Sequence, residues 1–159
     1  LANQTTMLMS ESLELGELVK AAMQARYGES EIAKHFQAFD TICSATQDRQ
    51  DAVITLLREK PIDLMIVIGG YNSSNTCNLA RICAASRPTF HIADPACLRS
   101  PEEIRHRPVG AKQEVTSTGW LPPADAVTIG LTSGASTPDN LVGAAIAKLE
   151  AFCLGDGGS

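Results

Sequence analysis

Short apolar runs alternate along this chain with longer segments in which apolar residues recur at helical spacing. The run Leu64–Ile68 is continuous and short, as in a strand that is buried on both faces. Between residues 141 and 149, apolar residues repeat with the period of an amphipathic helix. This alternation predicts an α/β protein in which βα units build a largely parallel sheet with right-handed crossovers.

The pattern also predicts where the individual elements lie. Strands are expected at residues 1–9, 39–43, 62–68, 89–93 and 126–131, and helices at about 11–26, 48–59, 76–85 and 138–152. Ser10 is placed to cap the first helix. Residues 101–108 are expected to form a further helix or a turn, followed by a polar connection to Pro123 that Trp120 anchors.

These elements predict a domain organisation. Residues 1–38 are expected to be the C-terminal end of a preceding α/β domain, residues 39–153 a further α/β domain, and residues 154–159 a disordered tail. The chain begins at Leu1 rather than at a methionine, and its first strand needs neighbours to pair with. We therefore expect it to be part of a longer protein.

Composition and charge argue against several classes of protein. The 159 residues are enough for one compact domain, or for one domain plus part of another. A net charge of −5 argues against binding to the nucleic-acid backbone, and an aromatic content of 4% supplies no platform for stacking bases. No apolar run approaches the ~18 residues of a membrane span.

The most informative polar segment follows the apolar run at Leu64. A turn with two glycines, Gly69 and Gly70, leads into Asn72–Asn75, a cluster of small hydrogen-bonding side chains that opens a helix. The first N–H groups of a helix lack internal partners and lie at its partly positive end, so this arrangement binds phosphates and carboxylates. The alternative is that Asn72 or Ser73 only caps the helix.

Similar turns recur elsewhere in the chain. Residues 43–47 and 132–136 also carry hydroxyls and amides where a predicted strand leads into a predicted helix, and the first predicted strand carries them at residues 4–6, almost without lysine or arginine. Because the carboxyl ends of parallel strands share one edge of a sheet, we expect these four turns to face one crevice that holds an anion. The alternative is that the polar side chains only satisfy exposed backbone groups.

The cysteines and histidines give weaker signals. None of the five cysteines forms a C-x-x-C pair, which argues against a zinc ribbon or a disulfide scaffold and favours a reduced intracellular compartment. Cys43 ends a strand just before a polar helix start, where a structural thiol and a ligand or reactive thiol are equally consistent with its position. We expect buried apolar thiols at Cys77, Cys83 and Cys153, and a surface connection at Cys97. The histidines, His35, His91 and His106, are expected to be solvated or packed.

Four motifs of the chain resemble the LytB (IspH) family of 4-hydroxy-3-methylbut-2-enyl diphosphate reductases. They are Leu1–Met7, Ile42–Val53, Gly70–Asn75 and Leu131–Asp139, and their order and approximate spacing match the family over all but the tail. The segment Trp120–Pro122 is similar to the plant and cyanobacterial branch. The resemblance implies the C-terminal part of an oxidoreductase that dehydroxylates its substrate to isopentenyl and dimethylallyl diphosphates in the non-mevalonate pathway.

The resemblance also implies a fold, a cofactor and site residues. The family forms a cloverleaf of three α/β domains around a [4Fe-4S] iron–sulfur cluster with three cysteine ligands, of which Cys43 matches the last. Ser73, Asn75 and Ser136 match residues that bind the substrate diphosphate, with Ser74 beside them in the motif. Thr5 matches a threonine that assists proton delivery, and Gln4 adjoins it. The other cluster cysteines, the diphosphate-binding histidines and the acidic proton donor of the family lie upstream of the matched region.

The implied partners are the allylic diphosphate substrate and ferredoxin or flavodoxin as electron donor, with no nucleic acid or membrane. The implied location is the plastid stroma in a photosynthetic eukaryote and the cytoplasm otherwise, without secretion. Because the upstream ligands are missing, this chain alone is expected to be inactive. Two alternatives stay open: a non-catalytic diphosphate-binding module, and a thiol-dependent enzyme that uses Cys43 but lacks an evident histidine base.

Overall fold

The computed structural model describes residues 8–39, 44–123 and 126–154. The chain divides into two compact units, Leu1–Asp48 and Arg49–Ser159, and each is described here by itself. The sequence-based boundary between residues 38 and 39 stays a prediction. None of the described helices has both the length and the apolar character needed to cross a membrane.

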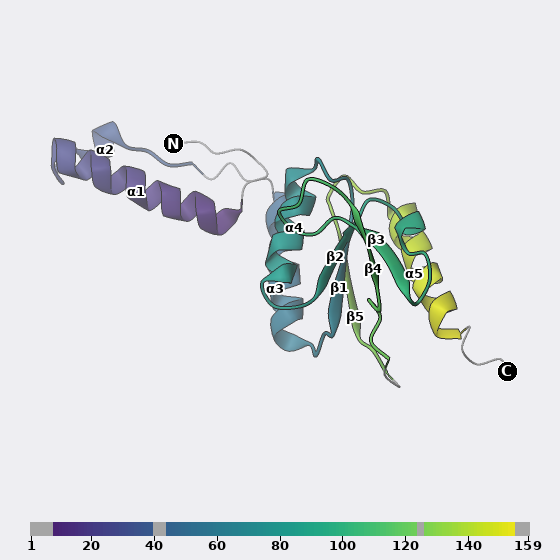
Figure 1. The fold of residues 1–159 in the computed structure, drawn as a ribbon. Coiled ribbons are helices and arrows are strands. Elements are labelled where there is room, and N and C mark those ends of the chain that lie inside the picture. The colour runs from purple at the N-terminus through teal and green to yellow at the C-terminus, as the bar shows by residue number, and fades with distance from the viewer. Residues whose placement is uncertain (1–7, 40–43, 124–125, 155–159) are drawn as a thin grey trace. The chain divides into compact units, whose positions relative to one another are not determined.

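The first unit contains the helices α1 (Met9–Tyr27) and α2 (Ile32–His35) (Figure 1). The helix expected at 11–26 is confirmed, but the cap expected at Ser10 is wrong, because Leu8 occupies the N-cap position and Ser10 lies inside α1. Gly28, with φ 85°, ends the helix, and its amide donates to the Gln24 carbonyl. Of the strand expected at 1–9, residues 1–7 lie outside the described residues, whereas Met9 is helical.

The second unit is organised around a three-stranded parallel sheet in the order β2-β1-β5. Its strands are β1 (Leu64–Ile68), β2 (Thr89–Ile92) and β5 (Ile129–Ser133). Its helices are α4 (Ser74–Ala84), α5 (Asp139–Leu154) and the part of α3 (Ser44–Glu59) that begins at Arg49. Helices α3 and α4 cover one face of the sheet and α5 the other (Figure 1). The α/β fold with a parallel sheet is therefore confirmed, although several element ends differ by a few residues from those expected.

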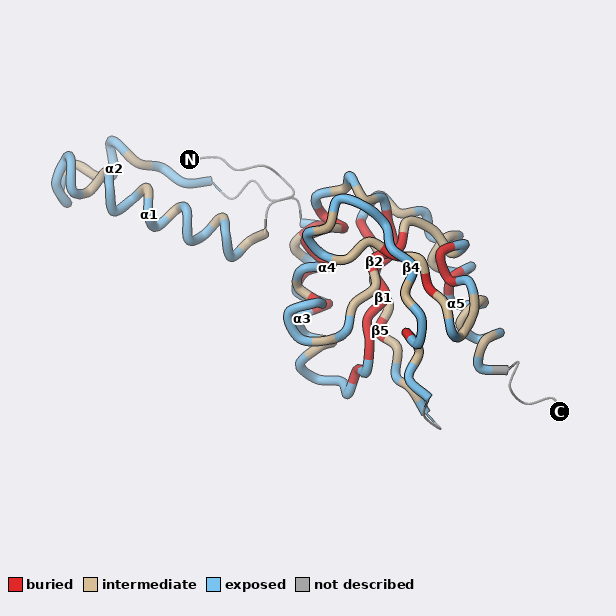
Figure 2. Tube along the Cα trace, viewed as in Figure 1, coloured by how far each residue is buried: buried red, intermediate tan, exposed pale blue. Residues whose placement is uncertain are grey.

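The strand β1 divides the hydrophobic core into two layers. Every residue of β1 is buried, which explains its continuous apolar sequence (Figure 2). Met65 and Val67 pack with α3 and α4, whereas Leu64, Ile66 and Ile68 belong to the layer that includes Ala145 of α5. Because successive side chains of a strand point to opposite faces, β1 contributes apolar residues to the core layers on both faces of the sheet.

The segment expected to be a helix or turn at 101–108 is instead a strand, β3 (Glu103–His106). It pairs antiparallel with β4 (Val115–Thr118) in a separate two-stranded sheet. Ile104 and His106 are buried while Glu103 and Arg105 are half-buried, so the segment has the alternation of a strand. Its charged residues concealed that period in the sequence.

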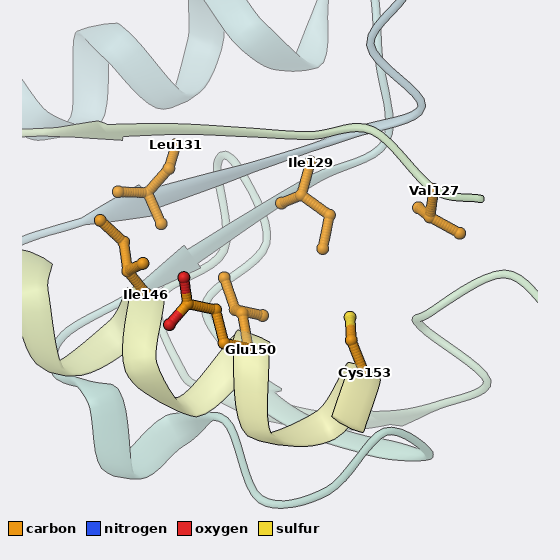
Figure 3. A pocket seen from close by; sticks show the side chains of 7 residues that line it. Val127, Ile129, Leu131, Ile146, Glu150 and Cys153 are labelled. Atoms are coloured by element: carbon orange, nitrogen blue, oxygen red, sulfur yellow. The ribbon is translucent and has the colours of Figure 1, made fainter. Parts of the chain in front are cut away.

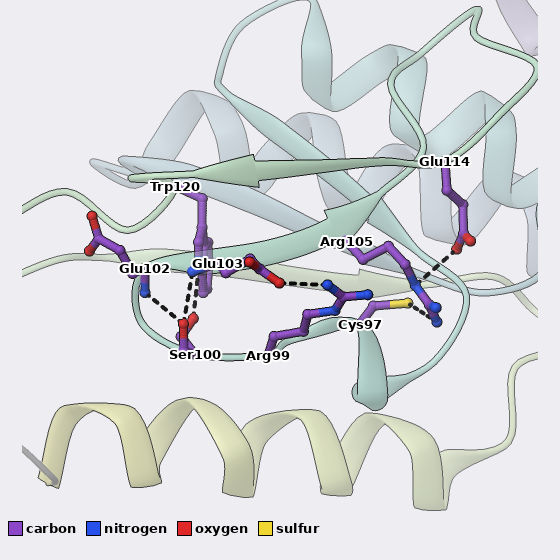
Figure 4. Close-up of polar contacts among 8 residues, drawn as sticks. All are labelled: Cys97, Arg99, Ser100, Glu102, Glu103, Arg105, Glu114 and Trp120. Carbon is purple, nitrogen blue, oxygen red and sulfur yellow. Dashed lines mark hydrogen bonds and ion pairs between the residues drawn. The ribbon is translucent and has the colours of Figure 1, made fainter.

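Polar contacts fix the ends of this hairpin (Figure 4). Trp120 is buried, and its indole Nε1 donates to the Ser100 carbonyl at 3.0 Å, which confirms its anchoring role. Arg99 forms an exposed ion pair with Glu103 at 2.6 Å. Cys97 is fully buried in a short 3₁₀ helix, Pro95–Cys97, so its expected surface position is wrong.

The other described cysteines are free thiols in different environments. Cys83 is fully buried in the α3–α4 layer, and burial raises the pKa of its thiol to about 12. Cys77 is half-buried at the start of α4, and Cys153 is exposed near the end of α5. The expected burial is therefore confirmed for Cys83 and wrong for Cys153, because that part of α5 lies against a groove rather than in the core.

The environment of His106 predicts that acidification destabilises the fold. His106 is buried edge-on against Phe90, with its Nε2 atom 2.9 Å from Ser117 Oγ, and burial lowers its pKa. Below a pH of about 6.5 the unfolded chain binds a proton that the folded chain resists, so stability falls as the pH approaches the folded-state pKa. Thermal unfolding should therefore show a smaller loss of stability between about pH 7.5 and about pH 5.5 for His106→Gln than for the wild type. Equal losses would contradict the assignment.

Candidate functional site

Two polar turns lie side by side at the carboxyl edge of the sheet. β1 and β5 pair in parallel, and Ile68 at the end of β1 lies opposite Ser133 at the end of β5. The Ile68 carbonyl accepts from the Gly134 amide at 3.0 Å and from Thr137 Oγ1 at 3.1 Å. The turn after β5 is thus bonded to the end of β1, as the parallel-sheet argument predicts.

The close approach of these turns requires glycine. Gly69 has φ 147°, and a Cβ at this position would lie 2.6 Å from Thr137 Oγ1 and 2.9 Å from Thr76 Oγ1. A Cβ at Gly134 would also overlap Thr76 Oγ1. The turn after β1, the turn after β5 and the first turn of α4 therefore meet around Thr76.

Residues 69–76, which we call the cradle segment, carry the start of α4. Ser73 is the N-cap residue, with φ −81° and ψ 113°, and its Oγ accepts from the Thr76 amide at 3.3 Å. The Cys77 amide donates to the Ser73 carbonyl at 3.0 Å, which is the first turn of the helix. Ser74 is exposed beside this cap. The capping role considered for Ser73 is thus observed, and α4 itself offers no acceptor to the amides of its first residues.

The side chain of Asn75 is the unusual feature of the cradle segment. Asn75 is only 4% exposed, yet neither its amide nitrogen nor its oxygen has a hydrogen-bond partner within the described part of the chain. Thr76 Oγ1 is also buried there without a partner. Buried polar groups are nearly always paired, because an unpaired one costs about 1–3 kcal/mol. A cluster of such groups at a helix start is typical of a surface that binds a polar ligand.

The structure brings together only some of the predicted site residues. Ser73, Ser74 and Asn75 lie at the start of α4, and the exposed Ser136 lies in the neighbouring turn after β5. Gln4, Thr5 and Cys43 lie outside the described residues. Of the four predicted turns, those after β1 and β5 therefore lie next to each other at one edge of the sheet.

Arginines reach these turns from elsewhere in the sequence. Arg49 of α3 donates to the Ser133 carbonyl at 3.4 Å. Arg107, just after β3, donates to the Tyr71 carbonyl at 2.6 Å and lies 3.1 Å from Cys77 Sγ. The turns themselves contain almost no basic residues, but arginines from other parts of the sequence contact their backbone. Nothing in the local sequence indicates these long-range contacts.

Two aromatic side chains in this region have shifted pKa values. Burial lowers the pKa of His91, and the nearby Arg107 acts in the same direction, so the ring is neutral near neutral pH. Its Nε2 atom lies 3.0 Å from the Gly69 carbonyl, and this geometry makes it the donor. Burial and a 2.7 Å hydrogen bond to Glu114 raise the pKa of Tyr71. The side chains of Tyr71, within the cradle segment, and of His91, which contacts it, are thus both uncharged. His91 is packed, as expected.

The described residues do not form a site for an iron–sulfur cluster. Within the described ranges, no group of three or more histidine, cysteine or acidic side chains is placed to hold a metal ion. Cys43, the cysteine that the family resemblance singles out, lies outside those ranges. The chemistry that can be derived from this site is therefore the binding of an anion by neutral dipoles.

A separate groove lies between β5 and α5, on the face of the sheet opposite α3 and α4 (Figure 3). Its volume is about 520 Å³, and its lining is apolar apart from Glu150. Val127, Ile129 and Leu131 line it from the strand side, and Ile146 and Cys153 from the helix side. A groove with this lining does not suit a phosphate or carboxylate, so the cradle segment remains the candidate anion site.

Comparison with known proteins identifies a family that this chain resembles over most of its length. The profile of a family described as "LytB protein" matches residues 1–150. A protein of Gloeobacter violaceus named 4-hydroxy-3-methylbut-2-enyl diphosphate reductase is 49% identical over 150 residues, covering 94% of this chain and 36% of the relative. The protein of the same name from Trichodesmium erythraeum is 46% identical over 155 residues, covering 97% of this chain and 38% of the relative. This chain thus spans little more than a third of the length of these curated relatives.

Two solved structures of reductases are similar to this chain. A structure of (E)-4-hydroxy-3-methyl-but-2-enyl diphosphate reductase matches with a TM-score of 0.54 at 26% identity, covering 94% of this chain and 42% of that chain. The Plasmodium falciparum E-1-hydroxy-2-methyl-but-2-enyl-4-diphosphate reductase matches with a TM-score of 0.51 at 22% identity, covering 93% and 37%. The second match is evidence for the fold alone.

The packing around Gly69 predicts a difference between neighbouring glycines. Gly69→Ala should lower the free energy of unfolding by about 1–3 kcal/mol, because the added methyl group overpacks the contact with Thr76 and Thr137. Gly70→Ala is the matched control, since a Cβ there meets nothing within 4 Å. Denaturant titration of both variants measures the difference. Similar losses in both would show that the close approach at Gly69 does not stabilise the fold.

Proposed function

Because the chain belongs to the LytB family, we propose that it is the diphosphate-binding, C-terminal part of a reductase that acts on 4-hydroxy-3-methylbut-2-enyl diphosphate. The products of that reaction are isopentenyl and dimethylallyl diphosphates. The observation that supports the proposal is the capped start of α4, where the buried Asn75 has no partner, next to the turn that contains Ser136.

The cradle segment has the properties that diphosphate binding requires. The first amides of α4 and the helix dipole attract negative charge, and the Asn75 side chain supplies a further donor. The hydroxyls of Ser74 and Ser136 are exposed on the two neighbouring turns, where they are available to a phosphate group. Ser73 shapes the site by capping the helix and is itself half-buried. We therefore assign Ser73, Ser74, Asn75 and Ser136 to the diphosphate site.

The role that we propose for this chain is to bind and orient the substrate. Binding energy at the diphosphate fixes one end of a small molecule, so that its allylic hydroxyl is presented to reacting groups elsewhere. Thr5, as an aid to proton delivery, and Cys43, as the third cysteine ligand of a [4Fe-4S] cluster, are part of the proposal by family resemblance. The described residues do not themselves form the cluster site. Ferredoxin or flavodoxin as electron donor, and a plastid or cytoplasmic location, stay predictions.

Replacement of the matching segment in a complete relative tests the proposal. Residues 1–150 of this chain would replace the segment to which they align in the Gloeobacter violaceus protein. We expect the chimera to retain reductase activity, and Ser136→Ala within it to lower kcat/KM about tenfold, because one charge-assisted hydrogen bond to the diphosphate is lost. A folded chimera that binds inorganic pyrophosphate but has no activity would favour the non-catalytic module.

The unpartnered amide of Asn75 predicts a trade-off between stability and binding. In Asn75→Leu the buried polar group is removed, so the thermal midpoint of the free chain should stay unchanged or rise. Its affinity for inorganic pyrophosphate, measured by calorimetry, should fall at least about tenfold.

Asn78, one turn further along α4, is the matched control for this variant. It is also buried, but its side chain takes part in an interaction within the protein. Asn78→Leu should therefore lower the thermal midpoint, because it leaves a partner unpaired. If Asn75→Leu destabilised the chain as much as Asn78→Leu and left pyrophosphate binding intact, Asn75 would be a structural residue.

A further inference from the structure

Resting on the proposed function, we propose that Arg107 is a positioning residue for the diphosphate site and acts through the backbone of the cradle segment. Arg107 follows β3, outside every turn that the sequence marks as polar. It contacts Tyr71 in the cradle segment and Cys77 in the first turn of α4, on either side of the helix start. His91, at the end of β2, supports the same backbone from the neighbouring strand.

The Arg107 guanidinium holds Tyr71 in two ways. Its Nη2 donates a charge-assisted hydrogen bond to the Tyr71 carbonyl at 2.6 Å, and its Cζ lies 4.7 Å from the centroid of the Tyr71 ring. The same Nη2 lies 3.1 Å from Cys77 Sγ in the first turn of α4, and Cys77 Sγ also donates to the Tyr71 carbonyl at 3.3 Å. One side chain therefore links the residue before the polar cluster to the helix after it.

His91 and Glu114 complete the support. His91 Nε2 donates to the Gly69 carbonyl at 3.0 Å, and the His91 and Tyr71 rings meet edge to face with centroids 4.9 Å apart. The Arg107 amide donates to the His91 carbonyl at 2.9 Å, which couples the two positioning side chains. Glu114 accepts from the Tyr71 hydroxyl at 2.7 Å. The carbonyls of Gly69 and Tyr71 are thus both held by side chains from outside the turn.

The hydrogen bonds that hold the Gly69 and Tyr71 carbonyls also fix the direction of the amide donors in residues 72–75. Residues 72–75 continue directly from the held peptide of Tyr71 into the N-terminus of α4. Rotation of that peptide would turn the Ser73 cap and the first helical amides away from a common ligand position. Misplacement of binding groups by about 1 Å is costly, so the loss of Arg107 should weaken anion binding without the loss of any direct contact with the anion.

The experiment uses the 159-residue chain and separates geometry from charge. Arg107→Gln removes the charge, whereas Arg107→Lys keeps the charge but not the planar guanidinium that lies over the Tyr71 ring while its Nη2 contacts the Tyr71 carbonyl and Cys77. Arg99→Gln is the matched control, because Arg99 forms an ion pair with Glu103 next to the same hairpin. Amide hydrogen exchange of residues 72–76 is measured by NMR without ligand, and thermal unfolding reports on global stability.

We expect exchange at residues 72–76 to be about tenfold faster in Arg107→Gln and unchanged in Arg99→Gln, because only the first variant frees the cradle segment for local opening. Titration with inorganic pyrophosphate, followed by the amide shifts of the same residues, should show affinity about five- to tenfold weaker in both Arg107 variants than in Arg99→Gln. Unchanged exchange in Arg107→Gln, or wild-type affinity in Arg107→Lys, would overturn the positioning role.

The two proposals fail in different ways. If the wild-type chain shows no amide shifts with pyrophosphate, the diphosphate site is wrong, while the exchange data still decide whether Arg107 holds the segment. If Arg107→Gln does not fold, His91 provides a second pair of variants. His91→Gln keeps a donor for the Gly69 carbonyl, whereas His91→Phe keeps only the ring contact with Tyr71. Pyrophosphate affinity should be retained in the first and reduced in the second, and equal affinities would overturn the proposal.

Discussion

The parallel pairing of β1 with β5 is the constraint on which the candidate site depends. It places the Ile68 carbonyl where the Gly134 amide and the Thr137 hydroxyl both reach it, and so joins two turns that are more than sixty residues apart in the sequence. Because β1 is buried on both faces, this register cannot slip without moving its apolar residues into the wrong layer. The hydrophobic core thus determines the position of the polar site at the edge of the sheet.

The unpaired polar groups of the site lower the stability of the fold, and the burial of apolar side chains in the core offsets this loss. Asn75 and Thr76 bury polar atoms without partners in the first turn of α4, where each costs about 1–3 kcal/mol if no ligand is bound. The same helix buries Leu79, Ala80 and Cys83 against Met65 and Val67. Helix α4 therefore has two ends of different character: a packed body that stabilises the fold, and a polar start that is satisfied only when something else supplies the partners.

Local pattern predicted the parts of this structure that local chemistry controls. The buried run of β1, the helices and the polar cluster at Asn72–Asn75 follow from periodicity and turn composition within short windows. The hairpin was missed because Ile104 is the only apolar residue in Glu103–His106, so the alternation of buried positions becomes evident only when the strand is paired with β4. Arg107 was missed for a related reason, since its role depends on a contact 36 residues distant in the sequence. Cys43, the cluster ligand expected from the family resemblance, lies outside the described residues.

The positive charge of Arg107 strengthens the backbone donors of the turn after β1, although its hydrogen bond to that turn is made to a carbonyl group. The Tyr71 carbonyl and the Asn72 N–H belong to one peptide group, so a charge-assisted hydrogen bond to that carbonyl polarises the N–H that faces away from it. His91 acts in the same way on the Gly69 carbonyl and the Gly70 N–H. Backbone donors at the cradle are thus strengthened in the same sense as by the α4 dipole, without a guanidinium directly on the anion.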